Sequence, residues 1–270
     1  MTVPMPSAYV QGIGLIGPGL TDWQSSVRAL AGEEAYSPRA TTVPTPEGLP
    51  PAERRRIGTT VKLALGVAQQ AVAAAALDPG ELLAVFSSSS GDGHICHEIC
   101  ETLASADRQL SPTRFHNSVH NAAAGYWSLA TGSMAASTAL CAYDGSFAAG
   151  LLEALVLVTV ERLPVLLSAY ETTYPEPLRA KRPVPDSFGM ALVLTPTPAP
   201  DARARLAARL CDPGAPADRL ADPRLEALRT AVPAARSLPL LRLLARGEPG
   251  EVVLDYIGEQ RMAVQVRECR

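Results

Sequence analysis

One stretch of the sequence, GSFAAGLLEALVLVTVE at residues 145–161, is apolar on almost every side when it is drawn as a helix. A helix that is hydrophobic all round avoids water, so it must be buried between other layers of the protein. The segments PVLLSAYE, residues 164–171, and FGMALVLTP, residues 188–196, have the continuous apolar pattern of strands that are buried on both faces. Buried strands next to a buried helix predict a layered fold.

Strands and helices alternate along the first part of the chain, which predicts an α/β architecture. The helices are expected at residues 55–77, 91–106 and 121–132, and a buried strand, LLAVF, is expected before the polar run SSSS at 87–90. The opening AYVQGIGLIGPG predicts a short strand and a glycine turn before a helix capped by Thr21 or Asp22. We predict one domain over residues 1–196.

The composition changes after residue 196, where Pro, Ala and Arg become frequent. This part predicts a linker with one strand or helix, then helical pieces interrupted by Pro233 and Pro239. The last segment, EVVLDYIGEQRMAVQVRE, predicts a hairpin that turns at Gly258 and Glu259. We expect residues 197–270 to form a short C-terminal extension that packs on the same fold.

The charge balance excludes several classes of partner. The net charge is −3 and Lys and Arg are scattered among Asp and Glu, which argues against nucleic-acid binding. The longest apolar run, Leu151 to Val160, contains Glu153 and is too short for a membrane span. Five cysteines without framework spacing fit reduced thiols, so we expect a cytoplasmic protein.

Gly12, Gly14 and Gly17 match the glycine pattern of a dinucleotide-binding turn, and Glu33 and Glu34 follow at a distance typical of a ribose ligand. The pattern fails at the next step, because Pro18 and Gly19 stand where the phosphate-binding helix must begin. We therefore predict a tight strand-to-helix turn and no cofactor.

The run HICHEIC, residues 94–100, offers four soft metal ligands, and Cys96 and Cys100 share a helix face. A structural zinc site draws a second ligand pair from elsewhere, yet His116 and His120 lie in another segment. A half-buried helix whose cysteines act as small hydrophobic residues explains the run better, so no metal site is predicted.

The segment RFHNSVHNAAAGYW places His116 and His120 four residues apart, next to Asn117 and Asn121. Such a pair could serve as the base for a thiol nucleophile at Cys141. A pair of structural histidines explains the spacing equally well.

The block from Ser111 to Ala154, followed by PVLLSAYE and FGMALVL, resembles the N-terminal half of the β-ketoacyl synthase family, which has the thiolase fold. The family pattern is an Asn, two residues, Ala-Gly, a helix, a small-residue strand and then the nucleophilic Cys before a long buried helix. Asn121, Ala124 and Gly125 match its start. The resemblance covers residues 8–196 and implies a thiolase-like layered α/β fold with a truncated C-terminal part.

The resemblance also fixes a register for the nucleophile. With Ala124 and Gly125 on the family's Ala-Gly and PVLLSAYE on its later strand, the chain fits without a gap and the nucleophile position falls on Asp144. Cys141 then lies three residues earlier, inside the strand. A carboxylate cannot hold an acyl chain as a thioester, so Asp144 marks a degenerate position and no catalytic residue is expected.

Active members of the family also carry two catalytic histidines in the C-terminal half, whereas all four histidines of this chain lie before residue 121. The resemblance thus implies a chain-length factor of aryl polyene or other polyketide-type or fatty-acid-like biosynthesis. Such a subunit forms a heterodimer with an active β-ketoacyl synthase and meets the acyl carrier protein only indirectly.

The resemblance further implies that Phe115, His116, Asn117, His120 and Asn121 contact the acyl chain or the dimer interface. The small-residue strand SMAASTAL would pair with the partner, because an open edge strand of this kind promotes aggregation. Two alternatives remain at this point. One is a small acyltransferase, thioesterase or ketosynthase that uses Cys141, and the other is a stand-alone binding module.

Overall fold

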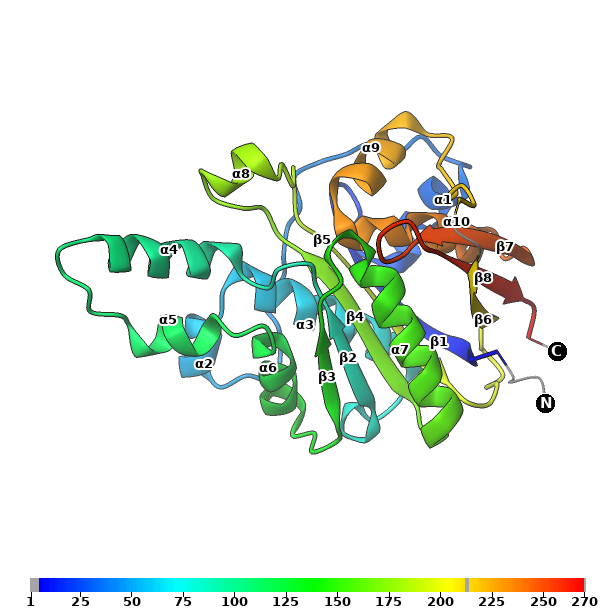
Figure 1. Cartoon of the computed structure of the whole chain (residues 1–270). Coiled ribbons are helices and arrows are strands. Elements are labelled where there is room, and N and C mark those ends of the chain that lie inside the picture. The colour runs from blue at the N-terminus through cyan, green and yellow to red at the C-terminus, as the bar shows by residue number, and fades with distance from the viewer. Residues whose placement is uncertain (1–4, 212–213, 270) are drawn as a thin grey trace.

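The computed structural model describes residues 5–211 and 214–269, and these form layers of helices around one eight-stranded sheet (Figure 1). The strands are β1 Ser7–Ile16, β2 Leu83–Ser87, β3 Ser137–Leu140, β4 Val165–Glu171, β5 Phe188–Thr195, β6 Ala204–Cys211, β7 Gly250–Asp255 and β8 Arg261–Arg267. Their order in the sheet is β3-β2-β4-β5-β1-β6-β8-β7. Strand β2 is parallel to both β3 and β4, and all other neighbours are antiparallel. The predicted α/β layered fold is confirmed.

The helices connect and cover these strands. They are α1 Trp23–Ala31, α2 Pro51–Arg56, α3 Thr59–Ala75, α4 Gly93–Ala104, α5 Pro112–Asn117, α6 Ala122–Thr131, α7 Ser146–Glu161, α8 Leu178–Lys181, α9 Pro223–Ala231 and α10 Leu238–Arg246. Short 3₁₀ turns are η1 Pro79–Glu81, η2 Tyr143–Gly145 and η3 Pro233–Ser237. The helices predicted at 55–77, 91–106 and 121–132 correspond to α3, α4 and α6.

Two apolar cores lie on opposite faces of the sheet. Helix α7 packs with η3 and α10 on one face, and α3 packs with α6 on the other. The stretch Tyr143–Glu161 is long and apolar enough for a membrane span, but 56% of its window is buried inside the protein. The apolar character of α7 therefore reflects its place in the core.

Gly12 and Gly14 lie inside β1 and not in the predicted turn. A Cβ at Gly12 would approach the carbonyl oxygen of Ala71 to 2.0 Å, and one at Gly14 would approach that of Val67 to the same distance. Both carbonyls belong to α3, so the glycines allow this helix to rest directly on the strand. Helix α1 begins only after Asp22, whose side chain caps it by accepting from the backbone N–H of Ser25.

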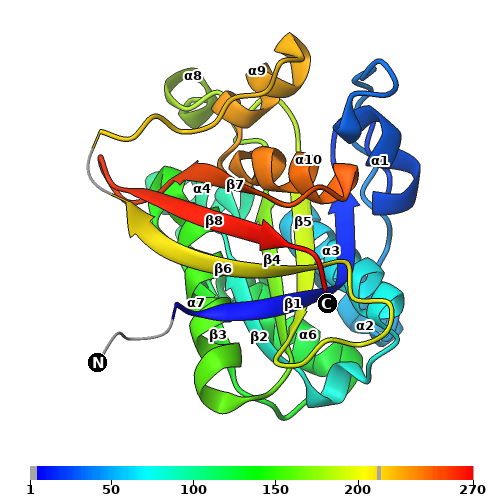
Figure 2. The same cartoon turned by 90° about the vertical axis from the view of Figure 1, so that its right-hand side faces the viewer.

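Residues beyond 196 extend the same sheet. Strand β6 pairs with the first half of β1, and the predicted hairpin at Gly258 is formed by β7 and β8 (Figure 2). Pro239 does not interrupt a helix as predicted. It lies in the first turn of α10, where its missing N–H has no helical partner to lose. The division at residue 196 remains a prediction.

Helices α4 and α5 form an arm that projects away from the sheet (Figure 1). The arm begins directly after the serine run that follows β2, and it returns to the body at α6. Its exposed apolar side chains include Leu103, Phe115 and Val119.

Candidate functional site

The turn between β3 and α7 forms one wall of a cleft of about 670 Å³. The cleft is lined on this side by residues 141–145, and on the other side by Arg236, Arg261 and residues 255–258. The carboxyl end of a parallel strand and the start of the next helix meet here, which is where open α/β sheets place their ligands.

Tyr143 has a left-handed backbone conformation, with φ of 50°, which is uncommon for a bulky residue. Its ring is exposed, and the guanidinium carbon of Arg182 lies 4.0 Å from the ring centroid. Strain of this kind is found where the surrounding structure fixes a turn. The turn therefore holds the next residue, Asp144, at a defined position just before α7.

Asp144 is held by two arginines from distant parts of the chain. Its Oδ1 lies 2.6 Å from Nη2 of Arg182, and its Oδ2 lies 3.0 Å from Nη2 of Arg236. Burial lowers the pKa of Arg182, but the hydrogen bond and the charge of Asp144 outweigh burial and raise it. Both carboxylate oxygens are occupied, so Asp144 acts as a clamp between the α8 loop and η3.

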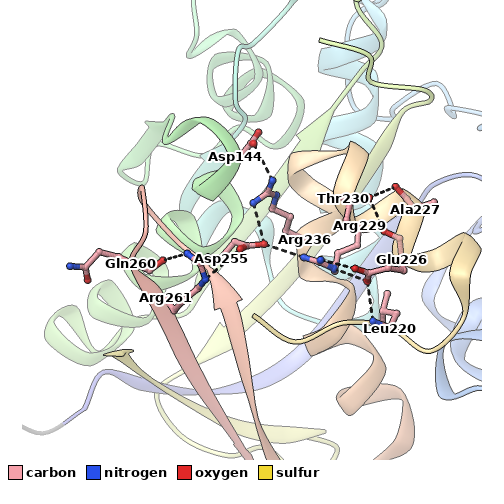
Figure 3. A network of polar contacts seen from close by, with 10 residues as sticks. All are labelled: Asp144, Leu220, Glu226, Ala227, Arg229, Thr230, Arg236, Asp255, Gln260 and Arg261. Carbon is pink, nitrogen blue, oxygen red and sulfur yellow. Dashed lines mark hydrogen bonds and ion pairs between the residues drawn. The ribbon is translucent and has the colours of Figure 1, made fainter. Parts of the chain in front are cut away.

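The clamp continues into a larger network of charges (Figure 3). Oδ2 of Asp255, in β7, lies 3.1 Å from Nη1 of Arg236 and 3.0 Å from Nη1 of Arg229. Oδ1 of Asp255 lies 3.6 Å from Nε of Arg261. Arg229 also pairs with Glu226 at 2.7 Å. The hydrogen bond to Glu226 is the main cause that raises the pKa of Arg229, and the same contact lowers that of Glu226. Ion pairs thus connect the cleft residues Arg236 and Asp255, in η3 and β7, to α9.

Cys141 is the first residue after β3 and not within the strand as predicted. Its side chain lines the same cleft, and Sγ donates to the carbonyl oxygen of Ser89 at 3.0 Å. Neither His116 nor His120 is among its hydrogen-bond partners in the described part of the chain. The geometry does not provide Cys141 with a base, as a thiol nucleophile needs.

The five residues predicted to contact an acyl chain or interface lie at the end of the arm and the start of α6. Phe115 is 61% exposed, whereas Asn117 is 2% exposed. The amide nitrogen of Asn117 donates to the carbonyl of Arg56, and its oxygen accepts from the hydroxyl of Tyr126. The buried Asn117 therefore holds the arm to the body.

The other three residues differ in their surroundings. The Nε2 of His120 lies 3.2 Å from the carbonyl oxygen of Ser88, and the ring of His116 stands edge-on to that of Tyr126. Asn121 precedes α6 without a capping hydrogen bond from its side chain. Their contact with a chain or a partner remains a prediction.

The HICHEIC run forms the first part of α4. There Nε2 of His97 lies 3.2 Å from Glu101, one turn away, and Cys96 and Cys100 are exposed. In the described ranges no three His, Cys, Asp or Glu side chains gather as a metal site.

Glu171 is a site residue that the sequence pattern did not indicate, because in the sequence it is only the last residue of the strand predicted at 164–171. It is 1% exposed at the end of β4, and its Oε1 accepts from the backbone N–H of Ser89. Burial raises the pKa of Glu171 to about 7, against the opposing effect of the hydrogen bonds from Ser89. The backbone of Ser89 thus lies between a buried carboxyl and Cys141, with its N–H bound to Glu171 and its carbonyl oxygen bound to the thiol. The available signal in the sequence was a carboxylate at the end of an otherwise apolar strand.

The comparisons with known proteins agree with the fold. The model of the family described as β-ketoacyl synthase, N-terminal domain, matches residues 23–248. None of the curated proteins matched this chain.

Solved structures share the fold at low sequence identity. The ketosynthase ApeO in complex with its chain length factor ApeC, from Xenorhabdus doucetiae, has a TM-score of 0.72 at 21% identity, over 96% of this chain and 99% of that chain. The ishigamide ketosynthase/chain length factor gives 0.72 at 15% identity, over 98% of this chain and all of that chain. A β-ketoacyl synthase from Burkholderia phymatum gives a TM-score of 0.69 at 11% identity, over 98% of this chain and 100% of that chain. The predicted resemblance to this fold family is confirmed.

Proposed function

Because the chain belongs to the β-ketoacyl synthase N-terminal domain family, we propose that it is a non-catalytic, ketosynthase-like subunit that pairs with an active β-ketoacyl synthase. In this role it is a chain-length factor of aryl polyene or related polyketide-type or fatty-acid-like biosynthesis. Two of the similar structures, ApeO–ApeC and the ishigamide proteins, are described as a ketosynthase with a chain length factor, which supports this class.

The observation that carries the proposal is the state of Asp144. Its carboxylate sits before the buried helix α7 with both oxygens bound to arginines. A carboxylate in two ion pairs is stabilised as a charged structural group, and it cannot form the thioester on which condensation depends. In this proposal the cleft corresponds to a synthase site in which Asp144 takes the place of the nucleophile.

The free edge of the sheet supports a pairing role. Strand β3 is the outer strand and pairs only with β2 among the described strands. Beside it, Met134 is 97% exposed and Leu129 is 57% exposed. Open strands and clustered exposed apolar side chains mark surfaces that another chain covers.

We assign the heterodimer to the cytoplasm, since the five cysteines are free thiols. The carrier protein then contacts the synthase subunit, and this chain meets it only indirectly. A similar structure that holds a ketosynthase with its acyl-carrier protein supports the involvement of a carrier.

Co-expression with candidate ketosynthases from the same gene neighbourhood tests the proposal. Size-exclusion chromatography with mass determination should give a one-to-one complex. A chain that stays monomeric with every candidate, or that condenses acyl groups alone, contradicts the proposal.

A further inference from the structure

Two arginines lie directly opposite each other on the open side of the sheet. In the antiparallel register, Arg205 of β6 faces Arg267 of β8, and Tyr9 of β1 faces Arg205 from the other side. Residues that are directly opposite in a sheet point to the same face. The flanking Leu206 and Val266 are buried, so the row formed by Tyr9, Arg205 and Arg267 points away from the core.

None of the helices in the described part of the chain covers this face. Figure 2 shows β1, β6 and β8 across the front of the molecule, with α7 behind them. Helix α3 covers β5 and the second half of β1, beyond this row.

The two arginines have neutral partners only, among the contacts of the described residues. Nη2 of Arg205 donates to Oγ of Ser7 at 3.0 Å, and Nη2 of Arg267 donates to Oε1 of Gln265 at 3.1 Å. In the same part of the sheet, Arg209 has its own acid, Glu251, at 3.0 Å. Like charges placed directly opposite destabilise a sheet, so this pair has a cost that an anion between the two guanidinium groups removes.

A cleft lies at the same place. Its volume is about 450 Å³, and it is lined by Tyr9, Arg205, Pro249, Arg267 and Glu268. Small-molecule sites have volumes of roughly 300–1,000 Å³ and carry a few polar groups on an apolar wall. The space is larger than a bare oxyanion requires, so a group attached to the anion also fits.

We propose that Arg205, Arg267 and Tyr9 form a binding site for a phosphoryl group. Glu268 also lines the cleft, but among the described contacts it forms no ion pair with Arg205 or Arg267, so both guanidinium groups are available to an anion. A phosphomonoester brings nearly two negative charges to them at neutral pH, whereas a carboxylate brings only one. The planar guanidinium groups bind phosphate oxygens in pairs, and the Tyr9 hydroxyl adds a donor. The site is separate from the Asp144 cleft and does not depend on the proposed pairing with a synthase.

Calorimetric titration of the full chain with inorganic phosphate and with ethyl phosphate tests the site, at constant ionic strength set by NaCl because screening weakens charge contacts. Acetate is the matched monovalent probe. Saturable binding of both phosphates and weaker binding of acetate are expected. If ethyl phosphate binds as tightly as inorganic phosphate does, the site accepts a group attached to the phosphoryl oxygen.

The variants Arg205→Gln and Arg267→Gln should each weaken phosphate binding about tenfold or more, the effect of one lost charge-assisted hydrogen bond. Arg209→Gln, on the same strand but paired with Glu251, is the control and should bind as the wild type does. Absence of saturable binding to wild type, or retained affinity in the double glutamine variant, overturns the proposal.

Arg267→Glu gives a second, independent readout. It places a carboxylate opposite Arg205, so the melting temperature without phosphate should rise and the response to phosphate should disappear. An Arg267→Glu protein that is less stable than wild type and still responds to phosphate contradicts the site.

Discussion

The carboxylate of Asp144 and the guanidinium group of Arg236 are joined at 3.0 Å across the cleft, although 92 residues separate them. This contact, with that of Arg182, connects the turn before α7 to the C-terminal part of the chain. The position that precedes the buried helix is therefore occupied by a structural ion cluster.

Replacing Asp144 by Asn should destabilise the protein, because Arg182 loses the carboxylate that it pairs with and Arg236 keeps only Asp255. We expect a loss of about 1–3 kcal/mol, between the values for exposed and for fully buried pairs, since the Asp144 side chain is 36% exposed. Urea unfolding followed by circular dichroism measures it. Glu259→Gln, an exposed change on the β7–β8 turn, is the control. An Asp144→Asn protein as stable as the control contradicts the clamp.

The buried carboxyl of Glu171 should make stability depend on pH. Its pKa is about 7 in the folded protein and near 4.5 in the unfolded chain, so the unfolded state loses its proton first as pH rises. The stabilisation present below pH 4.5 is lost between pH 4.5 and 7, and amounts to about 3 kcal/mol at most.

Glu171→Gln removes this titration while retaining an acceptor oxygen for Ser89. The difference in unfolding free energy between variant and wild type should therefore grow in favour of the variant from pH 5 to pH 8. Urea unfolding at both pH values measures this difference. Parallel pH profiles for the two proteins are the result that rules out a raised pKa at Glu171.

Gly14→Ala should be severely destabilising, because its Cβ would meet the Val67 carbonyl oxygen at 2.0 Å. We expect a loss of about 3 kcal/mol or more. The control is Gly125→Ala in α6, where a Cβ meets nothing within 4 Å. Alanine there should raise the free energy of unfolding by about 0.5–1 kcal/mol. Thermal melting of the two proteins gives the comparison, and equal melting temperatures contradict the packing of α3 on β1.

Partner pairing through β3 can be tested by proline substitution. The carbonyls of Ala136 and Leu140 accept from β2, so the backbone of Thr138 also faces β2 and that of Ala139 faces the free edge. Ala139→Pro should leave the isolated chain folded but weaken its association with the synthase about tenfold or more. Thr138→Pro should instead destabilise the isolated chain itself. Co-purification and melting measure the two effects, and association unaffected by Ala139→Pro rules out edge pairing.

The local pattern was sufficient to predict the elements with strong periodicity. The helix α3, the buried strands β2, β4 and β5, and the β7–β8 hairpin follow from apolar spacing and turn residues. The glycines of β1 could not be assigned correctly, because the reason for Gly12 and Gly14 is the backbone of α3, more than 50 residues away.

The site shows the same division. A polar residue between a small-residue strand and a buried helix can be recognised in the sequence, and Asp144 lies at that junction. Its partners Arg182 and Arg236 could not be predicted, because side-chain contacts across 38 and 92 residues depend on the tertiary fold. The burial of Glu171 likewise depends on the layers that cover the end of β4.

The most direct test of the non-catalytic role is the condensation rate of the complex with its synthase, measured with wild-type chain and with Cys141→Ala. We expect equal rates, and activity that disappears when the synthase subunit loses its own nucleophile. Loss of condensation in Cys141→Ala, together with labelling of Cys141 by a thiol-reactive acyl analogue, would contradict the non-catalytic role and make Cys141 the nucleophile.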